Sequence, residues 1–216
     1  MRKFFAGTIA CAAIVPFVFG CTFRRQEQNP PATVAVNAPP VGKQTGATVR
    51  DAIMGATATG PAATAINRRM DKQAQELAFQ LPGAIVQRLA GGIVVTMPEG
   101  LLFAQESDEL TSASRDNLRR LATSLENYPN TRIMIVGHTD SQGGTETNQS
   151  LSERRAQALA SFLEEIGINR ARMTAIGRGD AEPIAANDTD AGRQWNRRFE
   201  IALYADEAAR FGSVQP

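Results

Sequence analysis

The chain is poor in the side chains on which metal enzymes and disulfide scaffolds depend. Its 216 residues include one histidine, His138, and two cysteines, Cys11 and Cys21. A catalytic zinc site needs about three protein ligands, and a serine nucleophile needs a base, for which His138 is the sole histidine. Two carboxylates for glycan cleavage fit the composition, but no spacing indicates such a pair. We therefore expect a protein without enzymatic activity, and with no catalytic residue, metal or cofactor.

An excess of charge of either sign is also missing. Lys and Arg number 23 and Asp and Glu number 22, which gives a formal net charge of +1. Nucleic-acid-binding domains usually carry a basic face, so we expect no nucleic-acid partner. The hydrophobic share of 43% is that of a globular protein, and the length suits one ordinary domain with additional segments.

The first twenty residues have the layout of a secretory signal peptide. Arg2 and Lys3 precede an apolar run from Phe4 to Gly20. A buried core helix is the alternative, but Pro16 would interrupt it. We expect residues 1–20 to be removed on export.

Cys21 follows this run in a sequence, Val18-Phe19-Gly20-Cys21, that resembles the bacterial lipobox. The resemblance implies cleavage before Cys21 and acylation of its thiol and its new amine, which leaves the mature chain without a disulfide. Thr22 stands where an Asp would favour retention in the inner membrane, so the same resemblance implies transport to the outer membrane. The alternative is a buried cysteine in an uncleaved membrane anchor.

Residues 21–65 are predicted to form a tether. Prolines at positions 30, 31, 39 and 40 forbid a continuous helix. Residues 42–66 are rich in Gly, Ala and Thr, which favours a low-complexity linker over an oligomerisation patch. Residues 66–92 are predicted as a helical linker, because Ile66, Met70, Leu77 and Leu81 share one helix face and Pro82-Gly83 ends it. Residues 85–90 are expected to form a short strand or a turn.

The remaining chain alternates strand and helix patterns. Apolar, β-branched runs predict strands at 93–97, 132–136, 172–176 and 198–204. Helices are predicted after a cap at Thr111 or Ser112, after a capping box that begins at Ser150, and around residues 191–195. This alternation predicts an α/β domain over residues 93–205, followed by a tail at 206–216.

Several short segments occur in a fixed order within that domain. They are Gly137-His138-Thr139-Asp140, Asn148, Leu151 to Ala156, Gly177-Arg178-Gly179, Pro183-Ile184, Asn187, Gly192-Arg193 and Asn196 to Glu200. The series resembles the OmpA-like peptidoglycan-associating domain, and the Gly/Ala-rich segment before it is similar to lipoproteins of the YiaD or peptidoglycan-associated type. The resemblance implies a two-layer βαβαβ-type domain with helices packed on a mixed sheet.

The resemblance also implies that Asp140 and Arg155 hold the diaminopimelate of a peptidoglycan stem peptide. An ammonium and a carboxylate end that side chain, and a carboxylate and a guanidinium complement them with charge-assisted hydrogen bonds. We expect Arg155 to lie about one turn into its helix, near the favourable N-terminal dipole. The alternative is that Asp140 and Arg155 only form a salt bridge with each other.

Further residues are assigned to the pocket by the same resemblance. Thr139, Asn148 and Leu151 are expected to line or brace it, and Phe103 to form its rim, although Ala104 stands where the family often has Asp. Arg197 is expected either to contact the ligand or to bond loop carbonyls or Asp140, and the roles of Arg193 and Arg198 stay open. His138 is expected to be a locally bonded residue at a strand end.

These inferences together predict an outer-membrane lipoprotein with its domain in the periplasm. The domain would bind peptidoglycan without changing it chemically, and so tether the outer membrane to the cell wall. The alternative is an accessory subunit that anchors a larger envelope machine to peptidoglycan and has further protein partners there.

Overall fold

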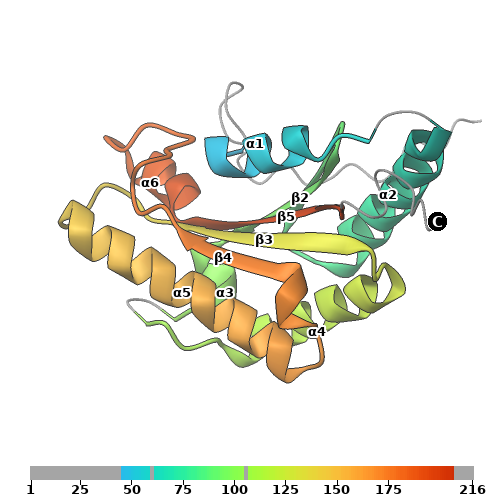
Figure 1. Ribbon diagram of the computed structural model, residues 1–216. Coiled ribbons are helices and arrows are strands. Elements are labelled where there is room, and N and C mark those ends of the chain that lie inside the picture. Colours follow the sequence, from blue (N-terminus) through green and yellow to red (C-terminus); the bar gives the residue numbers. More distant parts are fainter. Residues whose placement is uncertain (1–44, 59–60, 105–106, 207–216) are drawn as a thin grey trace, which may run out of the picture. The chain divides into compact units, whose positions relative to one another are not determined.

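The computed structural model describes residues 45–58, 61–104 and 107–206 (Figure 1). The predicted signal peptide, Cys21 and its tether up to residue 44, and the tail from residue 207 onward lie outside the described residues. Within the described part, no helix is both long enough and apolar enough to cross a membrane.

A mixed five-stranded sheet forms the centre of the fold. Its strands are β1 (Ile85–Leu89), β2 (Gly92–Pro98), β3 (Thr131–His138), β4 (Met173–Gly177) and β5 (Arg198–Ala205). Their order across the sheet is β1-β2-β5-β3-β4. β3 and β4 run parallel, whereas β1–β2, β2–β5 and β3–β5 are antiparallel. The predicted α/β fold with a mixed sheet is therefore confirmed.

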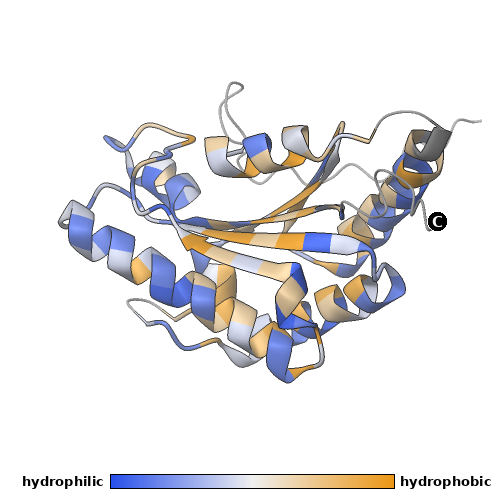
Figure 2. Cartoon of the chain, viewed as in Figure 1, coloured by the Kyte–Doolittle hydropathy of each residue, from blue (hydrophilic) through white to orange (hydrophobic). Residues whose placement is uncertain are grey.

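The main core lies on one face of this sheet, beneath α2 (Pro61–Gln80), α4 (Ser112–Asn127) and α5 (Thr145–Glu165). Alternate strand residues such as Ile93, Ile133 and Ile201 point into it, because side chains of a strand alternate between the two faces. The helices contribute Leu77, Leu121, Leu159 and other buried apolar residues. Figure 2 shows hydrophobic colouring along the strands and hydrophilic colouring over much of α5.

The opposite face of the sheet is covered by α1 (Ala47–Gly55), which corrects the prediction of a linker at this point (Figure 1). Val49 and Ile53, one helical turn apart, are fully buried and cluster with Val94, Val136 and Ala202. Two apolar residues among Ala, Gly and Thr give too weak a periodicity to be recognised in the sequence. The α1 helix therefore adds a cover to the second face of the expected two-layer domain.

Two carboxylates from distant parts of the chain hold the N-terminus of α1. The Gly46 N–H donates to both carboxylate oxygens of Glu200, at 2.9 and 3.0 Å, and the Thr48 N–H donates to Glu182 at 3.2 Å. The first N–H groups of a helix have no partner inside the helix, and the helix dipole favours negative charge there. The Glu200 side chain is fully buried, so this contact belongs to the folded core.

The segment predicted as a helical linker is also part of the same folded unit. The α2 helix begins at Pro61, and its Met70, Leu77 and Leu81 belong to the main core. Residues 85–89 form the edge strand β1, which pairs with β2 from Ile85↔Thr96 to Leu89↔Gly92. The region that folds together therefore begins well before residue 93.

The start of α4 agrees with the prediction from the sequence, whereas the start of α5 differs from it. Thr111 caps α4 as predicted, because its side chain accepts a hydrogen bond from the Ser114 N–H at 3.1 Å. The predicted capping box at Ser150 is wrong, since α5 already begins at Thr145. Gly143, at φ +91°, turns the chain into that helix, and Glu146 supplies the acidic residue of the first turn.

Candidate binding pocket

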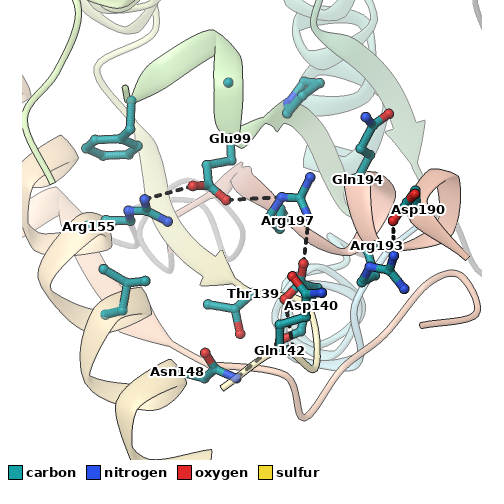
Figure 3. Close-up of a pocket in the computed structure, with 14 residues that line it drawn as sticks. Glu99, Thr139, Asp140, Gln142, Asn148, Arg155, Asp190, Arg193, Gln194 and Arg197 are labelled. Atoms are coloured by element: carbon teal, nitrogen blue, oxygen red, sulfur yellow. Dashed lines mark hydrogen bonds and ion pairs between the residues drawn. The ribbon is translucent and has the colours of Figure 1, made fainter. Parts of the chain in front are cut away.

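A pocket of about 840 Å³ opens where β3 ends (Figure 3). It lies between α5 and two short helices, α3 (Glu99–Leu102) and α6 (Asp190–Asn196). All seven residues that the sequence assigned to a ligand line it: Phe103, Thr139, Asp140, Asn148, Leu151, Arg155 and Arg197. Sequence reasoning missed Pro98, Glu99, Gly100, Gln142, Asp190 and Gln194, and it left Arg193 undecided.

Asp140 lies two residues beyond the end of β3 in a loop that hydrogen bonds hold in place. Its carboxylate accepts from the Gln142 N–H at 2.9 Å and from Arg197 Nη1 at 2.5 Å. The Asn148 side chain donates to the Asp140 carbonyl at 3.2 Å, and the Thr139 N–H donates to the Gly179 carbonyl at 2.9 Å. The negative charge of Asp140 is therefore fixed at the pocket wall, with a cation beside it.

Arg155 reaches the same pocket from α5, but from deeper in that helix than expected. It is the eleventh residue of α5, about three turns in, because the helix begins at Thr145 rather than near Ser150. The helix dipole acts mainly within the first turn, so it does not contribute at Arg155. Instead the Arg155 guanidinium stacks over Phe103 at 5.4 Å, and its Nε donates to the Ser107 carbonyl at 2.8 Å.

Asp140 and Arg155 do not form a salt bridge with each other. Arg155 Nη2 lies 2.7 Å from Glu99 Oε1, and Arg197 Nε lies 3.7 Å from the other oxygen of Glu99. Since Arg197 also pairs with Asp140, the charges alternate along a row from Asp140 through Arg197 and Glu99 to Arg155 (Figure 3). Arg197 thus has the bond to Asp140 that was one of its two predicted roles.

The Thr139 hydroxyl is the polar group of this pocket that most clearly lacks a bond. Thr139 is buried and lines the cavity, and its Oγ1 has no hydrogen-bond partner among the described residues. Buried hydroxyl groups are normally satisfied, because burial without a partner costs free energy. The pocket therefore offers two guanidinium groups and two carboxylates, and an unbonded hydroxyl is buried in its wall.

Arg193 and Arg198, whose roles stayed open in the sequence, differ in position. Arg193 lines the pocket rim, donates to the Asn187 carbonyl at 2.9 Å and pairs with Asp190. Arg198 is buried away from the pocket, where it lies 2.7 Å from Glu200 and donates to the Glu182 carbonyl at 3.1 Å. Arg198 thus supports the carboxylates that hold α1.

His138 ends β3 as predicted, but the expected local bond is absent. Neither ring nitrogen has a hydrogen-bond partner within the described part of the chain. Burial, with smaller contributions from the charges of Arg198 and Arg178, lowers the pKa of His138 to about 2. His138 is therefore a neutral residue at neutral pH. Among the described residues, no group of three or more His, Cys, Asp and Glu could hold a metal ion.

Most of the charged pocket at the end of β3 lies within a segment of the chain that matches a known protein family. Residues 102–197 match the model of the OmpA family, and this match includes all seven predicted pocket residues. This segment is therefore an OmpA-family domain, and the resemblance seen in the sequence is confirmed over it.

Individual relatives extend the similarity beyond that segment. The chain is 38% identical over 136 residues to the probable lipoprotein YiaD of Escherichia coli (strain K12), which covers 62% of each chain. It is 41% identical over 112 residues to outer membrane porin F of Pseudomonas fluorescens, which covers 52% of this chain and 34% of the porin. The chain thus spans less than two thirds of the length of each of these relatives.

Solved structures agree with the fold. The cell wall anchor of the T6SS from Pseudomonas aeruginosa is 31% identical, with a TM-score of 0.55, over 65% of this chain and 97% of that one. A putative MotB-like protein from Desulfovibrio vulgaris has a TM-score of 0.60 at 23% identity, over 74% of this chain and 96% of that one, which supports the fold alone.

Proposed function

We propose that the protein is an outer-membrane lipoprotein that binds the diaminopimelate residue of peptidoglycan stem peptides non-covalently and thereby tethers the membrane to the cell wall. The observation that carries this proposal is that Asp140 and Arg155, together with the unbonded hydroxyl of Thr139, line one pocket of about 840 Å³. A further support is the similarity to the peptidoglycan-associated lipoprotein of Legionella pneumophila, which is 34% identical over 104 residues.

The chemistry of the pocket suits the free end of diaminopimelate. That end carries an ammonium and a carboxylate on the same carbon. A guanidinium binds a carboxylate with paired, charge-assisted hydrogen bonds, and a carboxylate does the same for an ammonium. The pocket supplies both kinds of group, the guanidinium groups of Arg155 and Arg197 and the carboxylates of Asp140 and Glu99. Binding by several such bonds, with no nucleophile or metal needed, fits a holding function.

Many weak bonds would be enough for a tether. Acyl chains on Cys21 would anchor the chain in the membrane, each buried CH2 contributing about 0.8 kcal/mol. Copies of the protein that bind one sacculus would then act multivalently, so that single contacts can open while the layers remain joined.

The binding site is tested with the mature chain from residue 21, carrying Cys21→Ser so that it is soluble. We expect isolated sacculi to capture this protein and free diaminopimelate to release it. Asp140→Ala and Arg155→Ala should each weaken binding of diaminopimelate in calorimetry by about 2–5 kcal/mol, because each leaves a charge of the ligand or the pocket unpaired. Stem peptides with an amidated carboxylate, or with Lys in place of diaminopimelate, should bind less tightly.

Matched controls lie close to both residues. Arg154→Ala removes a neighbouring guanidinium that is about half exposed, and Asp188→Ala removes an exposed carboxylate; neither residue lines the pocket. Thermal unfolding of every variant separates loss of the site from loss of the fold. Equal affinity for diaminopimelate in folded Asp140→Ala, Arg155→Ala and the two controls would reject the pocket as the binding site.

The membrane anchor has a separate test in cells. We expect the full-length protein to fractionate with the outer membrane and the Cys21→Ser variant to appear in the soluble periplasmic fraction. An unchanged membrane fraction after Cys21→Ser would contradict anchoring through this cysteine, whatever the pocket binds.

A second candidate function is a peptidoglycan anchor within a larger envelope machine. It is favoured by the similarity to the cell wall anchor of the T6SS from Pseudomonas aeruginosa, which covers 65% of this chain. Crosslinking in cells followed by purification distinguishes the two roles. Stoichiometric protein partners, retained in the Asp140→Ala variant, would favour the machine, whereas peptidoglycan fragments alone would favour the tether.

A further inference from the structure

Glu99 is an acidic residue of the pocket for which the sequence patterns gave no role. It begins α3, and its backbone N–H donates to the Arg197 carbonyl at 3.0 Å, which fixes its main chain. Its carboxylate lies between two guanidinium groups, 2.7 Å from Arg155 Nη2 and 3.7 Å from Arg197 Nε. Figure 3 shows the side chain between Arg155 and Arg197, at the centre of the row of charges.

The contact with Glu99 occupies one terminal nitrogen of Arg155, Nη2. Only 3% of the Arg155 side chain is exposed, against 36% for Arg197. The Nε of Arg155 is bonded to Ser107 and one face of its guanidinium lies over Phe103. Because Nε is already bonded, a ligand carboxylate that binds Arg155 with two hydrogen bonds must use Nη1 and Nη2, and so must displace the Glu99 carboxylate from Nη2.

Displacement of Glu99 has different consequences for different ligands. A ligand with only a carboxylate would pair with Arg155 and leave Glu99, 14% exposed, without its nearest cation. Arg197 compensates poorly, because it lies 3.7 Å from Glu99 and is already paired with Asp140 at 2.5 Å. Leaving a largely buried charge unpaired is costly. A ligand that also carries an ammonium restores a cation to Glu99.

We propose that Glu99 is a specificity-determining residue, and that a zwitterionic ligand opens the Glu99–Arg155 ion pair and inserts into it. The ligand ammonium pairs with Glu99 and the ligand carboxylate pairs with Arg155. The charges then still alternate along the row, with the ligand as two added members. This inference rests on the proposed function and deepens it: the pocket selects an amino-acid terminus, with both charges on one carbon, and rejects a plain carboxylate.

Two probes of equal carbon length test this selectivity. Meso-diaminopimelate carries an ammonium beside each carboxylate, and pimelate is the same seven-carbon dicarboxylate without amines. We expect the wild-type protein to bind pimelate at least about tenfold less tightly than diaminopimelate, the effect of one lost hydrogen bond to a charged group. In Glu99→Gln, the ratio of the two dissociation constants should fall by about tenfold, mainly because pimelate binds more tightly.

The controls identify which carboxylate sets the ratio. Glu99→Asp keeps the charge and should keep the preference for diaminopimelate. A lower ratio in Glu99→Gln alone then results from the lost charge and not from a defect in folding. Glu146→Gln makes the same change at an exposed position of α5 outside the pocket and should leave the ratio unchanged. Circular dichroism and thermal unfolding establish that each variant is folded.

The outcomes separate this inference from the proposed function. If diaminopimelate binds but the ratio is the same in Glu99→Gln and the wild type, the insertion is refuted and the binding function stands. A ratio that falls in Asp140→Asn but not in Glu99→Gln assigns the ammonium to Asp140, which also refutes it. If neither the wild type nor Glu99→Gln binds either probe, both proposals fail.

Discussion

Substitution of Ile53 by Ala tests whether α1 is a structural part of the domain or a segment of tether. Ile53 is fully buried on the sheet face opposite the main core, in a cluster of five buried residues. If α1 is integral, the substitution removes buried apolar volume and weakens the folded state as a whole. If residues 45–58 only touch the domain transiently, the same change has little effect.

The magnitude follows from the size of the cluster. An Ile→Ala change in a protein core costs about 2–5 kcal/mol, and the cost depends on how far the site can collapse. The α1 layer is a single helix over the sheet and can relax inward, so we expect a loss near the lower end, about 2–3 kcal/mol. For a domain of this size each kcal/mol lowers Tm by about 2–4 °C, which gives a shift of about 4–12 °C.

Urea unfolding provides the assay, monitored by circular dichroism and by the fluorescence of Trp195, the single tryptophan of the chain. Trp195 lies on α6, so its transition reports on a different part of the domain from α1. Met54→Ala is the matched control, because Met54 adjoins Ile53 on the same helix and is 58% exposed; we expect a change within about 0.5 kcal/mol. Equal unfolding midpoints for the two variants would refute an integral α1.

Two further predictions concern buried positions of β3. The pKa of His138 is about 2 in the folded protein and about 6.5 when unfolded, so the unfolded state binds the extra proton and stability falls as pH drops below about 6.5. The free energy of unfolding should be about 2 kcal/mol lower at pH 5 than at pH 7, and His138→Asn should flatten this dependence; an equal slope in both proteins would show that His138 is not its source. Gly137→Ala would place Cβ 2.6 Å from the Ser152 carbonyl oxygen, so we expect a loss of about 1–3 kcal/mol. Gly55→Ala, which meets nothing within 4 Å, is its control, and urea midpoints that shift alike would contradict the steric argument.

The sequence was sufficient to predict those elements whose buried residues recur at the spacing of a strand or a helix. The strands expected at 93–97, 132–136, 172–176 and 198–204 correspond to β2, β3, β4 and β5 within one or two residues. Their β-branched runs carry a strong local signal, because the strands are covered on one or both faces. Seven of the fourteen residues that line the pocket were predicted, through the family resemblance that a series of motifs carried.

Long-range pairing could not be predicted in the same way. The N-terminus of α1 is held by Glu182 and Glu200, more than 130 residues away, and no local pattern marks these partners. Glu99 directly follows β2 and pairs with Arg155, which is 56 residues further along the chain, whereas in the sequence it looks like one residue of a Pro-Glu-Gly turn. The start of α5 was misplaced because Ser150 and Glu153 have capping-box spacing one turn inside a helix that a glycine turn begins.

The position of β5 has a consequence for the order in which the sheet can assemble. β5 is the last strand to be made, yet it pairs with both β2 and β3. Until residues 198–205 have emerged, the β1–β2 hairpin and the β3–β4 pair have no strand to join them, and the inner edges of β2 and β3 lack partners. Assembly of the sheet must therefore wait until residues 198–205 are available, and folding dominated by such distant pairings is slow. A chain that ends before Arg198 would hold two separate pairs of strands, with no strand between them to complete the sheet.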